Sequence, residues 1–176
     1  MTMMLKDRKL AWAGFRSFFP IMVVIAFAII SCVWYATRLV LAIVPQGGQA
    51  PVCFTVQPGD QWKISLTHSV ELSPWEDYFT INGPHDLTMT HTVFQSLGWG
   101  YPYSPDDGKL SHTEDGRFTM VMNRPYKDLS LRISEQAMQQ IIYKDQAYDL
   151  IGLYGQGAVV QVKAQYRYEY WLDTYL

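Results

Sequence analysis

The chain has 176 residues, of which 49% are hydrophobic and 17% charged, and its formal net charge is −2. A disordered chain would have fewer apolar residues and a larger net charge, and a nucleic-acid binder would be strongly basic, so both classes are excluded. Two cysteines are too few for a disulfide-rich scaffold. The length predicts about one domain of roughly 100–200 residues.

The N-terminal segment is predicted to anchor the chain in a membrane. Residues 18–37 contain no charge, and a helix that spans a bilayer needs about 20 residues. The apolar run resumes after Arg38 and stops before Pro45, so we expect a transmembrane helix over residues 18–44. Arg38 would then reach the lipid headgroups, with the amphipathic rings of Trp34 and Tyr35 anchoring the same end.

The charges of the first 17 residues predict the orientation of this helix. Four basic residues and one acidic residue give this tail a net charge of +3, which places it in the cytoplasm by the positive-inside rule. The rest of the chain would lie in the periplasm, outside the bacterial inner membrane. A cleaved signal peptide is an alternative, but its apolar region usually has about 7–15 residues. Ile30-Ser31-Cys32 faintly resembles a lipoprotein box without the polar tether that normally follows.

The remainder divides into a linker and a β-domain. Residues 45–51 are rich in Pro, Gly and Gln, which predicts a short linker. We expect an extracytoplasmic β-domain over residues 52–176. From residue 45 onward the chain has nine basic and fifteen acidic residues, so this part is acidic, with a net charge of −6.

Alternation of apolar and polar residues predicts strands throughout this domain. Trp62, Ile64 and Leu66 alternate with polar residues, as in a strand with one buried face. Asn82-Gly83 favours a hairpin, and residues 160–170 alternate over the length of a long strand. We count about eight or nine strands and no long helical pattern after Val44. The predicted fold class is therefore all-β, an antiparallel sandwich or small barrel preceded by one transmembrane helix.

Residues 68–77, HSVELSPWED, place several polar side chains close together. His68, Glu71, Glu76 and Asp77 are residue types that bind cations. His68 and Ser69 would point to opposite faces of a strand, which is poor geometry for a base and its nucleophile. The segment could equally be a polar turn with Trp75 closing the core edge, or a surface that binds a partner. No nucleophile-elbow, phosphate-loop or zinc-protease motif is present.

An aromatic loop at residues 94–102 is the second candidate site. Gly98 and Gly100 flank Trp99 and permit a tight backbone, and Tyr101 follows. This loop could cover the core. Alternatively, Trp99 and Tyr101 could form an exposed knob that docks on another protein, because such rings bury much area at little entropic cost.

These two segments carry a family resemblance. The chain resembles the DUF1850-like family, small membrane-anchored bacterial proteins catalogued as a domain of unknown function, over about residues 52–155. Trp99 is a departure, because a small residue is expected between the two glycines. The residues that carry the resemblance are His68-Ser69-Val70-Glu71, Pro74-Trp75-Glu76-Asp77, the loop from Phe94 to Pro102, Asp115-Gly116 and Leu129…Leu131-Arg132-Ile133.

The resemblance implies a non-catalytic accessory subunit of a TAXI-type tripartite ATP-independent periplasmic (TRAP) transporter. Such transporters take up organic acids or amino acids with a membrane permease and a soluble substrate-binding protein. Those proteins are the partners we expect, with no cofactor and no nucleic acid. An alternative is a periplasmic metal-dependent or ligand-binding envelope module that uses His68, Glu71 and Asp77. The candidate partner-binding residues are His68, Glu71, Trp75, Glu76, Trp99 and Tyr101.

Overall fold

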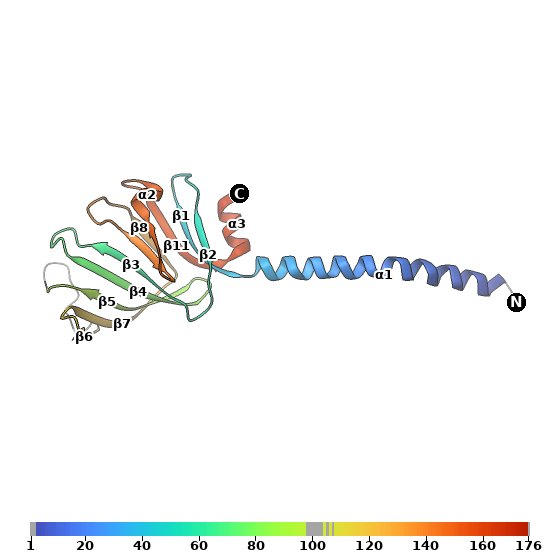
Figure 1. Cartoon of the computed structure of the whole chain (residues 1–176), viewed down its shortest axis with the longest axis horizontal. Coiled ribbons are helices and arrows are strands. Elements are labelled where there is room, and N and C mark those ends of the chain that lie inside the picture. The colour runs from blue at the N-terminus through green and yellow to red at the C-terminus, as the bar shows by residue number, and fades with distance from the viewer. Residues whose placement is uncertain (1–2, 98–103, 105, 107, 176) are drawn as a thin grey trace. The chain divides into compact units, whose positions relative to one another are not determined.

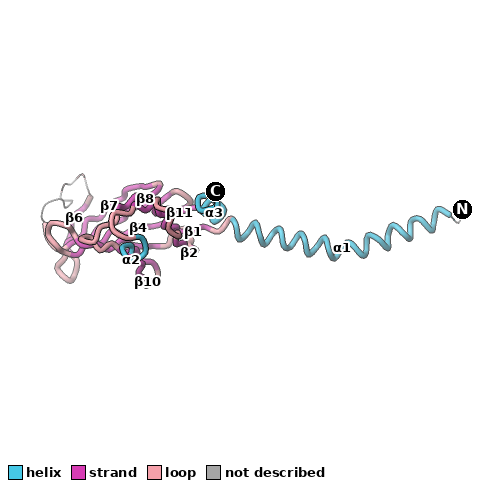
Figure 2. Tube along the Cα trace, turned by 90° about the horizontal axis from the view of Figure 1, so that it is seen from above, coloured by secondary structure: helices cyan, strands magenta, loops and turns pink. Residues whose placement is uncertain are grey.

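The computed structural model describes residues 3–97, 104, 106 and 108–175, with side chains described from Phe18 onward. These residues form two units that divide after Arg38. The first contains helix α1 (Met3–Ala36), and the second, from Leu39 to the C-terminus, is the β-domain. Figures 1 and 2 show that strands make up most of the β-domain, with α2 (Leu150–Tyr154) and α3 (Arg167–Tyr175) as its helices.

Helix α1 contains one stretch that is long and apolar enough to cross a membrane. This stretch, Phe18–Ala36, has 19 residues and a mean hydropathy of 2.4, and none of it is buried against the rest of the structure. Length and composition of this kind fit a membrane anchor or a signal sequence. The predicted anchor residues gather at the end of the helix, where the Arg38 guanidinium lies 3.7 Å from the centroid of the Trp34 ring, close to Tyr35 in the chain.

The prediction that the apolar helix continues to Val44 was wrong. Helix α1 ends at Ala36, and Leu39–Pro45 forms strand β1 at the centre of a sheet. The run stays apolar because both faces of β1 are covered: Leu41 and Ile43 face the core between the sheets, while Val40 and Ala42 face α3. A continuous apolar run fits such a doubly covered strand as well as a helix. The β-domain thus begins at Leu39 rather than after the predicted linker.

Two antiparallel sheets confirm the predicted all-β class. The four-stranded sheet has the order β2-β1-β11-β8, and the seven-stranded sheet has the order β10-β9-β3-β4-β5-β7-β6. The described part of the β-domain therefore has more strands than the eight or nine expected, because β1 was assigned to the apolar helix and the edge strand β6 has only four residues. The remaining strands are β2 (Val52–Thr55), β3 (Gln61–Thr67), β4 (Pro74–Gly83), β5 (Asp86–Phe94), β6 (Lys109–His112), β7 (Phe118–Tyr126), β8 (Asp128–Arg132), β9 (Gln140–Tyr143), β10 (Gln146–Asp149) and β11 (Val159–Tyr166).

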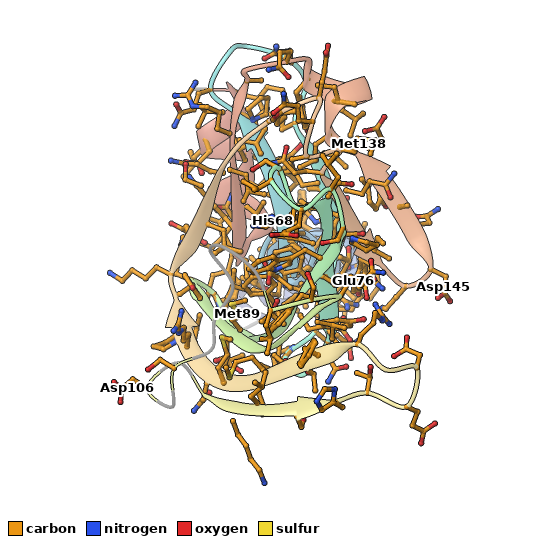
Figure 3. All side chains as sticks on the ribbon, turned by 90° about the vertical axis from the view of Figure 1, so that its left-hand side faces the viewer. His68, Glu76, Met89, Asp106, Met138 and Asp145 are labelled. Atoms are coloured by element: carbon orange, nitrogen blue, oxygen red, sulfur yellow. The ribbon has the colours of Figure 1, made fainter. Side chains whose placement is uncertain are left out.

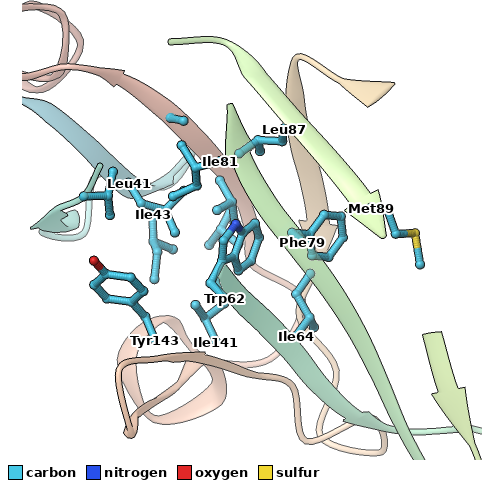
Figure 4. Close-up of a cluster of buried hydrophobic side chains, with 14 of the residues drawn as sticks. Leu41, Ile43, Trp62, Ile64, Phe79, Ile81, Leu87, Met89, Ile141 and Tyr143 are labelled. Carbon is cyan, nitrogen blue, oxygen red and sulfur yellow. The ribbon is translucent and has the colours of Figure 1, made fainter. Parts of the chain in front are cut away.

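The hydrophobic core lies between the two sheets. Leu41 and Ile43 of the four-stranded sheet face Trp62 and Phe79 of the seven-stranded sheet, and the Trp62 and Phe79 rings stack with centroids 4.6 Å apart (Figure 4). All four side chains are buried, and burial of such side chains contributes roughly 1.5–3 kcal/mol each. The alternation predicted for β3 is confirmed, since Trp62 and Ile64 are the buried positions of that strand.

The C-terminal segment differs from the long strand predicted over residues 160–170. Strand β11 ends at Tyr166, and Arg167–Tyr175 forms α3. The helix packs Tyr170 and Trp171 against Val40 and Ala42 on the outer face of the four-stranded sheet. The alternating aromatic residues matched the pattern of a strand. Residues 167–175 nevertheless form a helix, which buries Tyr170 against β1.

The predicted hairpin at Asn82-Gly83 is present as the β4–β5 hairpin. The last pair of the ladder joins Gly83 to Asp86, so Pro84 and His85 form the tip. The backbone of His85 is left-handed, with φ of 51°. Asn82 stabilises the strand ends instead of forming the tip, because its Nδ2 donates to Asp86 at 2.9 Å and to Thr88 at 2.8 Å.

Candidate functional site

In the segment singled out in the sequence, residues 68–73 form the turn between β3 and β4 and residues 74–77 begin β4. His68 begins this turn, and its backbone N–H donates to Ser73 at 2.8 Å. Inside the turn, the Leu72 N–H donates to the His68 carbonyl at 2.9 Å and the Glu71 N–H donates to His68 Nδ1 at 3.2 Å. Leu72 is held in a left-handed conformation with φ of 50°. His68 therefore organises the turn through both its backbone and its ring.

Alternation along β4 separates the predicted site residues onto two faces. Trp75 and Asp77 lie on the same face as core residue Phe79, whereas Glu76 lies on the opposite, outer face. The His68 ring stacks on Trp75, with centroids 5.6 Å apart and an interplanar angle of 10°. His68 and Glu76, both labelled in Figure 3, thus belong to different environments.

Asp77 is a largely buried carboxyl on the core side of β4. Its Oδ1 accepts a hydrogen bond from Trp75 Nε1 at 2.6 Å. The opposite residue in the ladder is Thr92, which is 0% exposed. Burial raises the pKa of Asp77, and hydrogen bonds from Trp75 and Thr92 only partly oppose that shift. A buried carboxyl with two donors is a polar link between strands.

Glu76 is the centre of an ion network on the outer face of the seven-stranded sheet. Its carboxylate pairs with Lys63 of β3, and it accepts from Arg117 at 3.2 Å and from the Tyr78 hydroxyl at 3.1 Å. Arg117 also donates to Asp115 at 2.7 Å. Burial alone would raise the pKa of Glu76, but the hydrogen bond and charge of Lys63, with Arg117 and Tyr78, hold that pKa below its ordinary value.

Two rings extend this network along the outer face. His91 of β5 stacks on Tyr78 of β4 with centroids 4.2 Å apart. Burial lowers the pKa of His91, and the nearby charge of Glu76 only partly opposes that shift. The sequence pattern singled out Glu76 but not its partners on this face, although the alternation of β3 places Lys63 on the face opposite to the core residues. The overlooked residues are Lys63, Tyr78, His91, Asp115 and Arg117.

One comparison with known proteins identifies a family. The family model described as "Domain of unknown function (DUF1850)" matches residues 62–150, just over half of the chain. The chain belongs to the DUF1850 family. No curated protein and no solved structure matches the chain.

The DUF1850 match follows the seven-stranded sheet. It runs from the second residue of β3 through β10, and so includes the β3–β4 turn and the Glu76 network. Strands β1, β2 and β11 and helices α1 and α3 lie outside the matched residues. Of the four-stranded sheet, only β8 is within the match, so the DUF1850 region needs strands from outside it to cover its core.

The described residues of this DUF1850 protein contain no group of three or more His, Cys, Asp or Glu side chains placed to hold a metal ion. His68, Glu71 and Asp77 are all described and do not form such a group: Trp75 lies between the His68 ring and the Asp77 carboxyl, and Glu71 is exposed in the turn. Trp99 and Tyr101 lie outside the described residues.

Several exposed apolar side chains lie at the end of the seven-stranded sheet that carries the β3–β4 turn. Val70 is 67% exposed and Leu72 is 72% exposed on the β3–β4 turn. Leu97, which follows β5 at the same end of the sheet, is also exposed. Met138, labelled in Figure 3, joins them because the Ala137 carbonyl accepts from the Thr67 N–H at 2.7 Å. We call these residues the turn patch: Val70, Leu72, Leu97 and Met138.

Proposed function

We propose that this DUF1850 protein is a membrane-anchored, non-catalytic accessory subunit of a TAXI-type TRAP transporter. Membership of the family supports the proposal, together with the resemblance from which the transporter association was inferred. The apolar stretch Phe18–Ala36 supports the anchor, since its length matches the hydrocarbon thickness of a bilayer.

The proposed topology places residues 1–17 in the cytoplasm and the β-domain in the periplasm, with α1 crossing the inner membrane. The net charge of +3 on the short N-terminal tail supports this orientation. The β-domain would then be exposed to the compartment in which a substrate-binding protein delivers solute to its permease. Holding that partner near the permease would raise its local concentration.

The observation that carries the proposed partner surface is the exposure of Val70 and Leu72 on a turn closed by backbone hydrogen bonds. Exposed apolar side chains on a rigid support lose little entropy when a partner covers them. In this proposal His68 and Trp75 support the turn from beneath, whereas the turn patch and Glu71 make the contact. Trp99 and Tyr101 remain proposed contacts.

Co-purification tests this function. The full chain is tagged and co-expressed with the permease subunits and the substrate-binding protein of a TAXI-type transporter from the same genome. We expect the permease, the binding protein or both to be retained after extraction in a mild detergent. If neither is retained above the level given by a tagged, unrelated single-pass protein, the proposed function is wrong.

A further inference from the structure

Helix α3 has apolar side chains both on the face that packs on the sheet and on an exposed stripe beside it. On the inner face Tyr170 is buried, and together with Trp171 it packs against β1. On the outer face Tyr168, Leu172 and Tyr175 follow one another at positions i, i+4 and i+7, the spacing of one helix stripe. These three side chains are 40%, 51% and 75% exposed. The inner face has its partner in the sheet, whereas in the outer stripe Tyr168 stacks on Tyr166 and Leu172 and Tyr175 remain exposed.

Each charged residue of α3 makes a contact with the β-domain. Arg167 donates to Thr55 at 2.6 Å, and Asp173 pairs with Lys163 of β11 at 3.1 Å. Glu169 accepts from the backbone N–H of Tyr166 at 2.7 Å, as a carboxylate at the start of a helix commonly does. The outer stripe itself consists of two phenol rings and one leucine, and the Tyr168 hydroxyl donates to Glu169 at 3.3 Å.

Two residues, Thr37 and Arg38, connect α1 to β1, the strand that pairs with β11 just before α3 begins. Leu39 is paired with Tyr166 in the β1–β11 ladder, and α3 begins one residue after Tyr166. Ala36, the last residue of α1, is three peptide steps from Leu39, which is at most about 11 Å of extended chain. If α1 spans a bilayer, the first turn of α3 cannot lie far from the bilayer surface.

We propose that the outer stripe of α3 lies in the headgroup region of the bilayer that α1 crosses. Tyrosine is enriched at membrane–water interfaces because its ring is apolar while its hydroxyl remains hydrated. A short helix with one apolar stripe binds such an interface with its axis in the membrane plane. The stripe would hold the β-domain against the membrane with its four-stranded sheet toward the lipid. This inference rests on the membrane anchor of the proposed function, and it is independent of the transporter partners.

The test uses the full chain in nanodiscs of phosphatidylcholine and phosphatidylglycerol. A nitroxide is attached at Leu172→Cys in a background of Cys32→Ser and Cys53→Ala, and its collision rates with oxygen and with a water-soluble nickel complex are compared. The matched control is the same label at Val121→Cys, which is 51% exposed on the outer face of the other sheet. We expect the oxygen-to-nickel ratio to be several times higher at residue 172 than at residue 121.

Each result decides the inference. Equal ratios at the two positions would overturn it, as would spin–spin broadening at residue 172, which would mean that a second copy covers the stripe. A chain that does not insert into nanodiscs would overturn the anchor as well, whereas an immersed label on a chain that binds no permease would leave this inference intact. Because Cys53 packs beneath α3, a photoreactive p-benzoylphenylalanine in place of Tyr175 repeats the test with both native cysteines. Lipid adducts identified by mass spectrometry are expected there and not at Val121.

Discussion

The indole nitrogen of Trp75 donates a hydrogen bond of 2.6 Å to the carboxyl of Asp77, two residues further along the same face of β4. One face of the Trp75 ring stacks against the ring of His68, which begins the β3–β4 turn. A buried carboxyl, an indole and an imidazole thus connect the core to the exposed turn. The turn patch rests on this arrangement, and its shape depends on residues that make no surface contact themselves.

Replacing Asp77 is expected to change how stability depends on pH. The pKa of Asp77 is raised above 3.8 mainly by burial, so the folded protein holds this proton more tightly than the unfolded chain does. The contribution of Asp77 to stability therefore falls as the pH rises through the interval between 3.8 and the raised pKa. Asp77→Asn keeps a side-chain oxygen that accepts from Trp75 Nε1, and it removes the pH-dependent loss of stability because an amide does not ionise. Urea unfolding of both proteins in a mild detergent should show the wild type losing stability relative to Asp77→Asn from acid to neutral pH. A difference that is constant with pH would contradict the assignment.

The Glu76 network is expected to stabilise the outer face of the seven-stranded sheet. Glu76→Gln would leave Lys63 and Arg117 close together without the carboxylate that both contact. We expect the free energy of unfolding to fall by about 1–3 kcal/mol at neutral pH, the usual cost of losing hydrogen bonds to a charged group. Since the pKa of Glu76 is held below 4.5 in the folded state, its contribution is fully present above pH 4.5 and is lost as the pH falls through the lowered value.

A matched control for this experiment is Glu71→Gln. Glu71 lies five residues before Glu76 and can be given the same Glu→Gln substitution, but its side chain is exposed in the turn. We expect its effect on unfolding to stay within about 0.5 kcal/mol, as for most surface substitutions. Equal effects of the two substitutions would show that the network adds no stability.

The boundary between helix α1 and the β-domain can be tested at Leu41. This residue is 0% exposed between the sheets, so Leu41→Ala should lower the free energy of unfolding by about 2–5 kcal/mol. The control is Ile29→Ala in α1, which is 58% exposed and should leave the unfolding of the β-domain unchanged. Protease resistance of the β-domain in increasing urea measures both. Equal midpoints would mean that residues 39–44 belong to the apolar helix after all.

That boundary marks what sequence reasoning could not decide. The sandwich was predictable because Trp62 and Ile64 alternate with polar residues and because Asn82-Gly83 favours a hairpin. The strand at Leu39–Pro45 was not predictable, because it is apolar at every position. One of its faces is buried against the second sheet and the other against α3. Periodicity does not distinguish such a strand from the continuation of an apolar helix.

The candidate site was predictable only in part. Residues 68–73 do form a turn with His68 at its start, and alternation along β4 alone separates Glu76 from Trp75 and Asp77. The partners of Glu76 depend on pairing between distant segments. Arg117 is 41 residues away in the chain, and no local pattern predicts that contact. Strand register, which the packing of the whole sheet determines, supplies it.

The turn patch provides the sharpest test of the proposed partner surface. Val70→Asp together with Leu72→Asp would place two charges where the proposal requires apolar contact, and an unpaired charge in an interface is costly to desolvate. Both positions are exposed, so the unfolding of the chain should be unchanged. In the co-purification assay we expect the retained partner to fall by about tenfold or more, corresponding to a loss of about 1.4 kcal/mol or more. Val121→Asp, on an exposed strand face away from the turn, is the matched control and should retain the partner as the wild type does. Retention by the double variant at the wild-type level would exclude the turn patch as the contact surface and direct attention to other faces of the β-domain.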